Sequence, residues 1–200
     1  MDIYLVDQIM RGHIAPGMSI LEAGCGGGRN LRHFLRRGYE VSAADPDART
    51  VERVRSMAQE LAPRLPSSNI RVESAEAMTF AERSADVVIS SAVLHFARDD
   101  AHFRAMLDGS WRPLADGGLF FCRLASDIGM EGRFQPLGGR RFRLLDGSER
   151  YLASERLLMD ETTRLGGHLV DPLKTTVVQG MRCMTTWVVR RQAGGPSRLR

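Results

Sequence analysis

Glycine and acidic residues of this chain are spaced as a nucleotide-binding loop requires. A short apolar strand leads into Glu22 and the glycines at positions 24, 26 and 28. Asp45 ends the next apolar stretch, about 20 residues after the first glycine, where an acid can accept hydrogen bonds from both hydroxyls of a ribose. Glycine lets a cofactor lie against the backbone and permits positive φ. The pattern therefore indicates a cofactor that contains a nucleoside.

Arg29 and Glu22 indicate which cofactor the glycine loop suits. A dinucleotide fingerprint reads G-x-G-x-x-G, and this chain has Arg29 where the third glycine belongs. Glu22 would repel a pyrophosphate, whereas the cationic methionine part of S-adenosylmethionine tolerates an acid at that point. These two residues therefore argue against an NAD-dependent oxidoreductase and favour S-adenosylmethionine.

The stretch Glu22 to Gly28 resembles motif I of the class I S-adenosylmethionine-dependent methyltransferases, D/E-x-G-x-G-x-G. Two later segments are similar to motifs of that family, namely Val93-Leu94-His95 and the turn Leu114 to Gly118. Within the family, the continuation Gly28-Arg29-Asn30 most resembles the small bacterial methyltransferases related to the tellurite-resistance type. The resemblance implies S-adenosylmethionine as methyl donor and S-adenosylhomocysteine as product.

The resemblance also implies that the cofactor-binding residues follow the first four strands. Asp45 has an alternative role as a helix N-cap, and Glu22 has one as an acceptor for loop N–H groups. Ser74 stands where the family has an acid that holds the adenine amino group, so the adenine contact is left open between Ser74, Ala75 and Glu76. The expected cofactor-binding residues are Glu22, Ala23, Gly24, Cys25, Gly26, Gly28, Asn30, Asp45, Pro46, Ser74, Ala75, Glu76, Ser90 and Ser91.

His95 is the candidate for catalysis. It follows a strand whose carboxyl end meets the methyl donor in the family, and histidine titrates in the range that suits a general base. The alternative is a structural histidine bonded to the backbone. Because a sulfonium already activates the methyl group, catalysis can rest on placing the acceptor along the C–S axis, and a base is needed only if the acceptor must lose a proton. His102 is expected to be exposed on its helix.

Hydrophobic patterning predicts strands and helices that alternate along the chain. A helix begins at Ser154, and others are predicted over 2–12, 31–37, 46–61 and 99–111. The predicted strands are 18–21, 39–44, 69–73, 87–89 and 119–124, followed by a hairpin of 168–178 and 181–189. The resemblance implies an α/β, Rossmann-like fold with a seven-stranded, mostly parallel sheet, helices on both faces and an antiparallel last strand.

Residues 125–153 show little regular pattern and carry several glycines. A loop of this length in a compact domain is usually functional or mobile, and in this fold it lies where substrate enters, so we interpret it as a substrate lid. Its residues Arg140, Arg141 and Arg143 either offer a positive face to an anionic substrate or are simply solvated, and solvation is the favoured interpretation. The sequence leaves the roles of Lys174 and Arg182 open.

Length and composition fit one domain, which we assign to residues 1–191, with a flexible tail over 192–200. No apolar run approaches the ~20 residues of a membrane span, and the N-terminus lacks the features of a signal peptide. Three cysteines without C-x-x-C spacing predict neither a disulfide framework nor a zinc site, and no metal-ligand cluster is found. We therefore expect a cytoplasmic protein without a metal.

The acceptor of the methyl group is expected to be a small molecule. The net charge of +4 comes from arginines scattered along the chain, which is weak evidence for a nucleic-acid partner. An RNA or protein methyltransferase and a cofactor-binding protein without activity are the alternatives. Fold and cofactor do not fix the acceptor, and the sequence does not set the oligomeric state.

Overall fold

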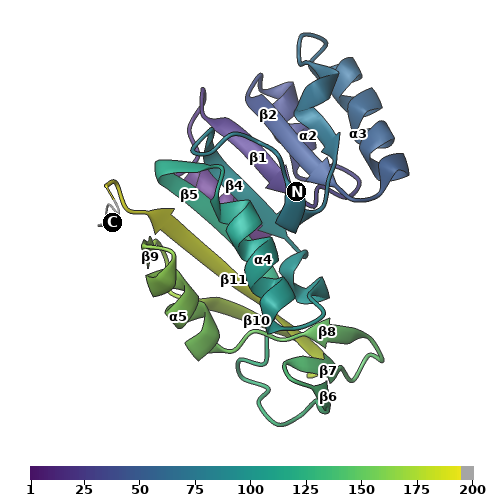
Figure 1. Ribbon diagram of the computed structural model, residues 1–200, viewed down its shortest axis with the longest axis vertical. Coiled ribbons are helices and arrows are strands. Elements are labelled where there is room, and N and C mark those ends of the chain that lie inside the picture. The colour runs from purple at the N-terminus through teal and green to yellow at the C-terminus, as the bar shows by residue number, and fades with distance from the viewer. Residues whose placement is uncertain (195–200) are drawn as a thin grey trace.

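A mostly parallel sheet forms the middle layer of this computed structural model, in which residues 1–194 are described (Figure 1). The strands follow in the order β10-β11-β5-β4-β1-β2-β3, and a short β9 pairs with the end of β11. β11 runs antiparallel to β5 and β10, which confirms the predicted antiparallel last strand. The strands are β1 (Ser19–Ala23), β2 (Glu40–Asp45), β3 (Ile70–Val72), β4 (Ala85–Ser91), β5 (Leu114–Ala125), β9 (Gly167–Leu169), β10 (Lys174–Val178) and β11 (Arg182–Arg191).

Helices cover both faces of this sheet, as predicted. Side chains alternate along a strand, so Val87 of β4 points to one face and Val88 to the other. Val87 packs in the cluster that holds α1, α2 and α3, and Val88 packs in the cluster that holds α4 and α5. The helices are α1 (Ile3–Met10), α2 (Leu31–Arg36), α3 (Ala48–Leu61), α4 (Asp100–Trp111) and α5 (Glu155–Arg164).

Polar caps fix where four of the helices begin. Side chains accept hydrogen bonds from backbone N–H groups at the starts of α1, α3, α4 and α5, and the capping residues are Asp2, Asp47, Asp99 and Ser154. The helix predicted from residue 46 therefore begins at Ala48, after its cap. Because Asp47 caps α3, the carboxylate of Asp45 is not the N-cap, and the N-cap alternative for Asp45 was wrong.

The strand predicted over 168–178 is interrupted in the structure. β9 ends at Leu169 and β10 begins at Lys174, and Pro172 between them has no N–H with which to continue a ladder. The Asp171 carboxylate turns to α1, where Arg11 and Gln8 donate to it at 2.5 and 2.9 Å. The predicted hairpin of β10 and β11 is confirmed. Its turn residues Gln179 and Gly180 both have positive φ, as tight hairpin turns require.

The segment 125–153 forms a small antiparallel sheet, so the expectation of an irregular loop was wrong (Figure 1). Its strands are β6 (Gln135–Gly138), β7 (Arg141–Arg143) and β8 (Glu149–Tyr151). Both ends of the segment are fixed beside each other, because the Ala153 N–H donates to the Ala125 carbonyl and the Asp127 N–H donates to the Ala153 carbonyl, each at 3.2 Å. We call residues 127–152 the lid sheet. Its role over a substrate stays a prediction.

None of the described helices is long and apolar enough to cross a membrane. Most of the predicted tail, residues 195–200, lies outside the described part of the chain. The single-domain boundary at residue 191 stays a prediction.

Candidate cofactor site

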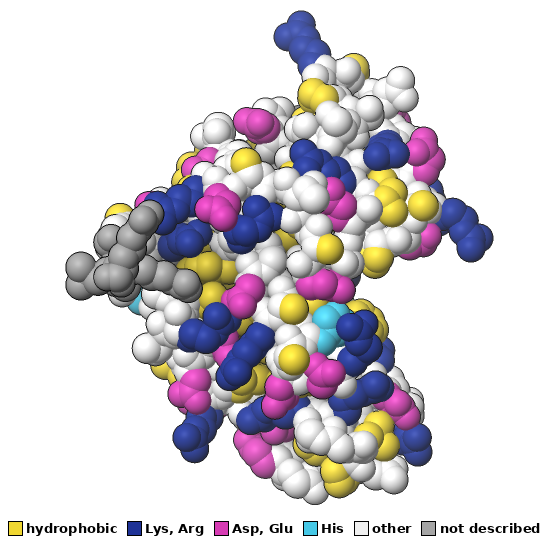
Figure 2. Space-filling model, in the orientation of Figure 1, with side chains coloured by type: hydrophobic (Ala, Val, Ile, Leu, Met, Phe, Trp, Pro, Cys, Tyr) yellow, Lys and Arg dark blue, Asp and Glu magenta, His cyan; other side chains and the backbone are white. Residues whose placement is uncertain are grey.

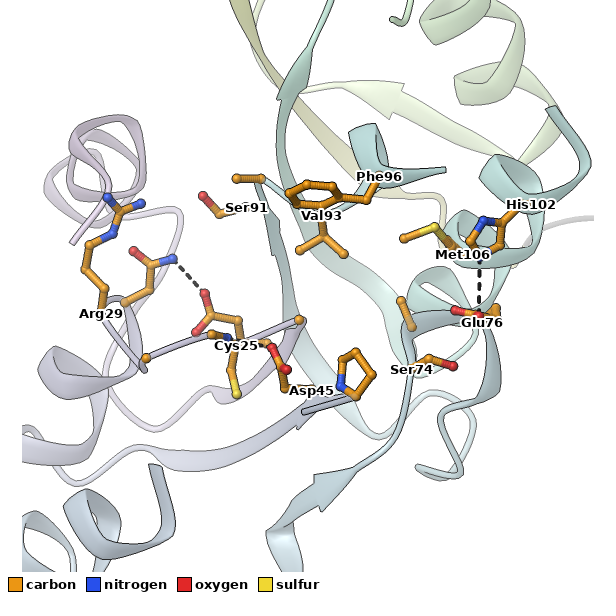
Figure 3. A pocket seen from close by; sticks show the side chains of 18 residues that line it. Cys25, Arg29, Asp45, Ser74, Glu76, Ser91, Val93, Phe96, His102 and Met106 are labelled. Carbon is orange, nitrogen blue, oxygen red and sulfur yellow. Dashed lines mark hydrogen bonds and ion pairs between the residues drawn. The ribbon is translucent and has the colours of Figure 1, made fainter. Parts of the chain in front are cut away.

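A cavity of about 600 Å³ opens where the parallel strands β1, β2 and β4 end (Figure 3). Ligands of open α/β sheets bind at this edge, and the volume falls within the range of about 300–1,000 Å³ found for small-molecule sites. Loops after the strands form most of the wall, and α4 contributes two side chains. The lining residues are Glu22, Gly24, Cys25, Gly26, Gly27, Arg29, Asn30, Asp45, Pro46, Ser74, Ala75, Glu76, Ser91, Ala92, Val93, Phe96, His102 and Met106.

Glu22 is a buried acid with one free oxygen. Its side chain, at the end of β1, is only 2% exposed. Asn30 Nδ2 donates to Glu22 Oε1 at 2.6 Å, whereas Oε2 has no hydrogen-bond partner among the described residues. Burial raises the pKa of Glu22 to about 8, although the hydrogen bond from Asn30 and the charge of Arg29 oppose that rise. A carboxyl group so placed is suited to a cationic ligand, which would return it to the ionised form.

Asn30 links this acid to the start of the chain. Asn30 Oδ1 accepts from the Asp2 N–H at 2.9 Å, and the Asp2 carboxylate in turn accepts from Arg123 Nη1 at 3.0 Å. The residue before α1 is therefore fixed to the loop after β1 and to β5. This arrangement orients the Asn30 amide so that its NH₂ group faces Glu22.

Asp45 lies at the end of β2, the strand that pairs with β1 (Figure 3). Its Oδ2 accepts from the Gly26 N–H at 2.9 Å, and its Oδ1 accepts from the Asp47 N–H at 3.0 Å. Each carboxylate oxygen has a second lone pair, so Asp45 can still accept bonds from a diol. The two backbone bonds hold the carboxylate at the cavity edge.

The glycine loop passes close to its neighbours at two of its glycines. Gly24 has φ +73°, and a Cβ there would lie 2.5 Å from Val93 Cγ2. Gly28 has φ +71°, and its Cβ would meet the Met57 side chain of α3. Gly28 therefore serves the packing of loop against helix and does not line the cavity, unlike Gly24 and Gly26.

The far end of the cavity is made by the 3-10 turn η2 (Ala75–Ala77) and by α4. His102 of α4 lies with its Nε2 3.3 Å from Glu76 Oε1 (Figure 3). Burial raises the pKa of Glu76, but hydrogen bonds from its own backbone and from His102 outweigh that effect, and the net pKa is lowered. The expectation that His102 is simply exposed was wrong, because α4 packs closely enough on η2 to bring it into the wall. Gly109 permits this approach, since a Cβ there would clash with the Ala75 carbonyl.

His95 sits behind the cavity wall. It belongs to the turn η3 (Leu94–Phe96) after β4, is 6% exposed, and does not line the cavity although Val93 and Phe96 do. Its Nδ1 accepts from the Ala125 N–H at 3.1 Å, so the proton of the neutral ring is on Nε2. Burial lowers the pKa of His95 to about 4, and the charge of Arg150 adds to that effect. This geometry favours the structural alternative.

Most of the predicted cofactor residues are brought together here, but three are not. Ala23 and Ser90 are buried inside the strands β1 and β4, and Gly28 packs on α3. Sequence reasoning missed seven lining residues: two lie within the glycine loop, and five reach the cavity from the turn after β4 or from α4, where no local pattern marks them. They are Gly27, Arg29, Ala92, Val93, Phe96, His102 and Met106.

Several basic residues with open roles are paired outside the cavity. Lys174 Nζ lies 3.4 Å from Asp7, and Arg182 lies 3.6 Å from Asp146. Arg141 and Arg143 of the lid sheet both contact Glu149, at 3.1 and 2.9 Å. Within residues 1–194, no group of three or more His, Cys, Asp or Glu side chains is placed to hold a metal ion.

The family model and the curated relatives indicate one family. The family described as "Methyltransferase domain" matches residues 21–122, which include every residue of the cavity wall. The chain is 34% identical over 124 residues to a ubiquinone biosynthesis O-methyltransferase of Methylocella silvestris, a match that covers 59% of this chain and 45% of the relative. Across three such curated relatives, the chain spans 45–64% of their length.

Two solved structures illustrate the likeness in fold. A S-adenosylmethionine-dependent methyltransferase of Methanosarcina mazei superposes with a TM-score of 0.73 at 16% identity, covering 92% of this chain and 97% of that one. The 1,6-didemethyltoxoflavin-N1-methyltransferase of Burkholderia thailandensis, with 1,6-didemethyltoxoflavin and S-adenosylhomocysteine bound, gives a TM-score of 0.70 at 17% identity and coverage of 94% and 77%. At these identities the likeness concerns the fold.

Proposed function

The chain belongs to the class I S-adenosylmethionine-dependent methyltransferases, and we propose that it transfers the methyl group of S-adenosylmethionine to a small-molecule acceptor. The observation that carries this proposal is the free, buried Oε2 of Glu22, which lies in the cavity wall one strand away from Asp45. S-adenosylmethionine has an ammonium group, which suits the free oxygen of Glu22, and a ribose diol, which suits the carboxylate of Asp45.

The residues of the cavity fit the cofactor from one end to the other. Glu22 would hold the ammonium group, and the guanidinium of Arg29 beside it would hold the carboxylate. Asp45 would accept from the ribose hydroxyls. Ser74, Glu76 and Met106 surround the end that remains for adenine, where an apolar face and a polar edge are both needed. Because Gly24, Gly26 and Gly27 have no side chains, they leave room for the cofactor to lie along the loop.

The protein's part in this reaction is placement and exclusion of water. When bound, S-adenosylmethionine would supply a methyl group on a sulfonium: the acceptor's lone pair would form the new bond to carbon, and the C–S electron pair would stay on sulfur. An acceptor that carries a proton on that atom would release it to the bulk solvent. Val93 and Phe96 form an apolar wall after β4, the point at which an acceptor must approach. Orientation of this kind can supply a large part of a rate enhancement.

A small molecule is the acceptor class that the observations favour. One relative acts in ubiquinone biosynthesis and one structural neighbour methylates 1,6-didemethyltoxoflavin, and both names refer to small organic acceptors. Figure 2 shows that Lys and Arg side chains are distributed over the visible face and alternate with Asp and Glu. A nucleic-acid substrate would favour a continuous basic surface. Because the three cysteines are free and buried, a reducing compartment such as the cytoplasm suits the protein.

Calorimetric titration with S-adenosylmethionine, S-adenosylhomocysteine and NAD tests the cofactor directly. We expect the two sulfur compounds to bind and NAD not to bind. Turnover is then measured with radiolabelled methyl donor on a panel of small thiols, phenols, amines and carboxylates, with RNA and protein as separate arms. Folded protein that binds neither sulfur compound would contradict the proposal, and binding without turnover on any arm would support a cofactor-binding protein without activity.

A further inference from the structure

An aromatic ring is exposed at the mouth of the cavity. Phe96 is 58% exposed, although it lines the cavity beside Val93. Figure 3 shows its ring above the cavity, on the same side as Ser91 and Val93 and opposite Asp45. Large apolar side chains exposed at a pocket mouth usually mark a binding surface. This ring therefore offers a flat apolar contact at the place where the chain leaves β4.

A cation of the lid sheet lies over this ring. The guanidinium carbon of Arg150, on β8, is 4.9 Å from the centroid of the Phe96 ring. Side chains alternate along a strand, so Arg150 points away from the face on which Glu149 pairs with Arg141 and Arg143. Of these lid-sheet arginines, Arg150 is the one that contacts a residue of the cavity wall, namely Phe96, although Arg150 does not itself line the cavity.

Arg150 keeps most of its hydrogen-bonding capacity. Its Nη1 donates to the Glu149 carbonyl at 2.7 Å, and within residues 1–194 it forms no salt bridge. The acid whose pKa it helps to lower, Asp146, is itself bonded to Ser148 and lies 3.6 Å from Arg182. A guanidinium has five N–H donors, so several remain for a ligand.

The strand that carries Arg150 is firmly attached to the body of the protein. The neighbouring Tyr151 is fully buried, stacks on Phe103 of α4 with ring centroids 4.8 Å apart, and donates to the Asp100 carboxylate at 2.8 Å. Its aromatic contact and hydrogen bond fix β8 relative to α4 and η3. Arg150 is therefore held over the Phe96 ring by a defined element and not by a free loop.

We propose that Phe96 and Arg150 form an acceptor subsite that selects a planar aromatic molecule with a carboxylate group. The ring of the acceptor would lie against the apolar wall of Phe96 and Val93. Its carboxylate would accept hydrogen bonds from the free N–H groups of Arg150, because two N–H groups of one guanidinium can bind the two oxygens of one carboxylate. This inference rests on the proposed function, because it assigns the acceptor of the same cavity.

Two probes of the same size and shape test the subsite, one an anionic carboxylate and the other its neutral amide. We choose 2-naphthoate and 2-naphthamide, titrated calorimetrically into the protein saturated with S-adenosylhomocysteine. For the wild type we expect the carboxylate to bind about tenfold more tightly than the amide, because a charge-assisted hydrogen bond is lost in the amide. Arg150→Gln should bind both probes equally. Phe96→Ala should weaken both probes by a similar factor.

Arg143→Gln is the matched control, since it removes an arginine of the same small sheet that pairs with Glu149, whereas Arg150 is the one that stacks on Phe96. It should keep the preference for the carboxylate. All variants are first titrated with S-adenosylhomocysteine, which shows that they are folded and loaded. Failure of that titration in the wild type would count against the proposed function itself. Normal loading with no binding of 2-naphthoate, with equal binding of the two probes, or with a preference that survives Arg150→Gln would overturn the acceptor subsite alone.

Discussion

Asn30 binds one oxygen of Glu22 and leaves the other free. The 2.6 Å bond from Asn30 Nδ2 occupies Oε1, and Oε2 stays buried without a partner among the described residues. A half-satisfied buried carboxyl is costly in an empty site and becomes favourable when a cation arrives. The site is therefore prepared to bind a cation at Oε2 of Glu22.

Glu22 should make cofactor affinity depend on pH. With a pKa of about 8 the carboxyl is mostly protonated at pH 7, and a bound cation favours its ionised form, so binding releases a proton. Affinity for S-adenosylmethionine should therefore rise between pH 6 and 8, and calorimetry in buffers of different ionisation enthalpy should detect the proton. Glu22→Gln should bind about tenfold more weakly at pH 8 and lose this dependence. The exposed Glu40→Gln is the control, and a pH slope that persists in Glu22→Gln would contradict the assignment.

Asp45 and Asp47 should separate cofactor binding from helix stability. Asp45→Ala is expected to weaken S-adenosylhomocysteine binding by about 1–3 kcal/mol, because hydrogen bonds from the ribose to a charged acceptor are lost. Asp47→Ala removes the N-cap of α3 instead, so it should lower the free energy of unfolding by about 1 kcal/mol and leave affinity nearly unchanged. Calorimetry and urea unfolding of both variants measure the two effects. An unchanged affinity in Asp45→Ala would contradict the assignment of Asp45 as the acceptor for the ribose hydroxyls.

His95 should act on stability more than on catalysis. In His95→Ala the buried Ala125 N–H loses its acceptor, which should cost about 1–3 kcal/mol of unfolding free energy at pH 7. The pKa of His95 is lowered to about 4, so the unfolded chain binds the extra proton first and wild-type stability should fall as pH drops from about 6.5 to 4. His95→Ala should flatten that part of the curve, whereas the exposed His168→Ala should not. An altered pH–rate profile in His95→Ala would instead support its role as a base.

Gly24 and Gly27 should respond differently to the same added methyl group. Gly24→Ala forces a side chain to φ +73° and against Val93, so the protein without ligand should lose about 1–3 kcal/mol of unfolding free energy. A Cβ on Gly27 meets nothing within 4 Å, and Gly27→Ala should stay within about 0.5 kcal/mol of the wild type. Thermal unfolding of the two variants without cofactor is the measurement. Equal losses in both would show that the close approach of the loop to Val93 is not what requires glycine.

The spacing of residues that are close in the sequence predicted the part of the site formed by backbone groups and short side chains. Glu22, the glycines and Asp45 follow one another within two strand–turn units, so their spacing alone predicted that they would meet. His102 and Phe96 could not be predicted in this way. The first reaches the cavity because Gly109 lets α4 approach η2, and the second because of the direction of a single turn after β4. Such contacts depend on packing between elements that the sequence separates.

The lid sheet escaped prediction for a related reason. Its strands are short and mostly exposed, so they lack the apolar alternation by which strands are recognised. Cross-strand pairs of Arg141 and Arg143 with Glu149 stabilise it instead. The central strands β4 and β5 are buried on both faces and showed continuous apolar runs, so they were predicted, whereas the more exposed stretch 168–178 was predicted as one strand and forms two.

The paired junction at Ala125 and Ala153 has an evolutionary consequence. The chain leaves the main sheet and returns to it at adjacent positions, so hydrogen bonds at these two positions hold the ends of the lid sheet together. The length of the segment between them can therefore change without moving the neighbouring strands and helices. Extending such a segment costs little entropy, because closure entropy grows only with the logarithm of length. If the proposed acceptor subsite is correct, the segment that supplies Arg150 can therefore gain or lose residues over generations without displacing Phe96 or the glycine loop, which lie outside it.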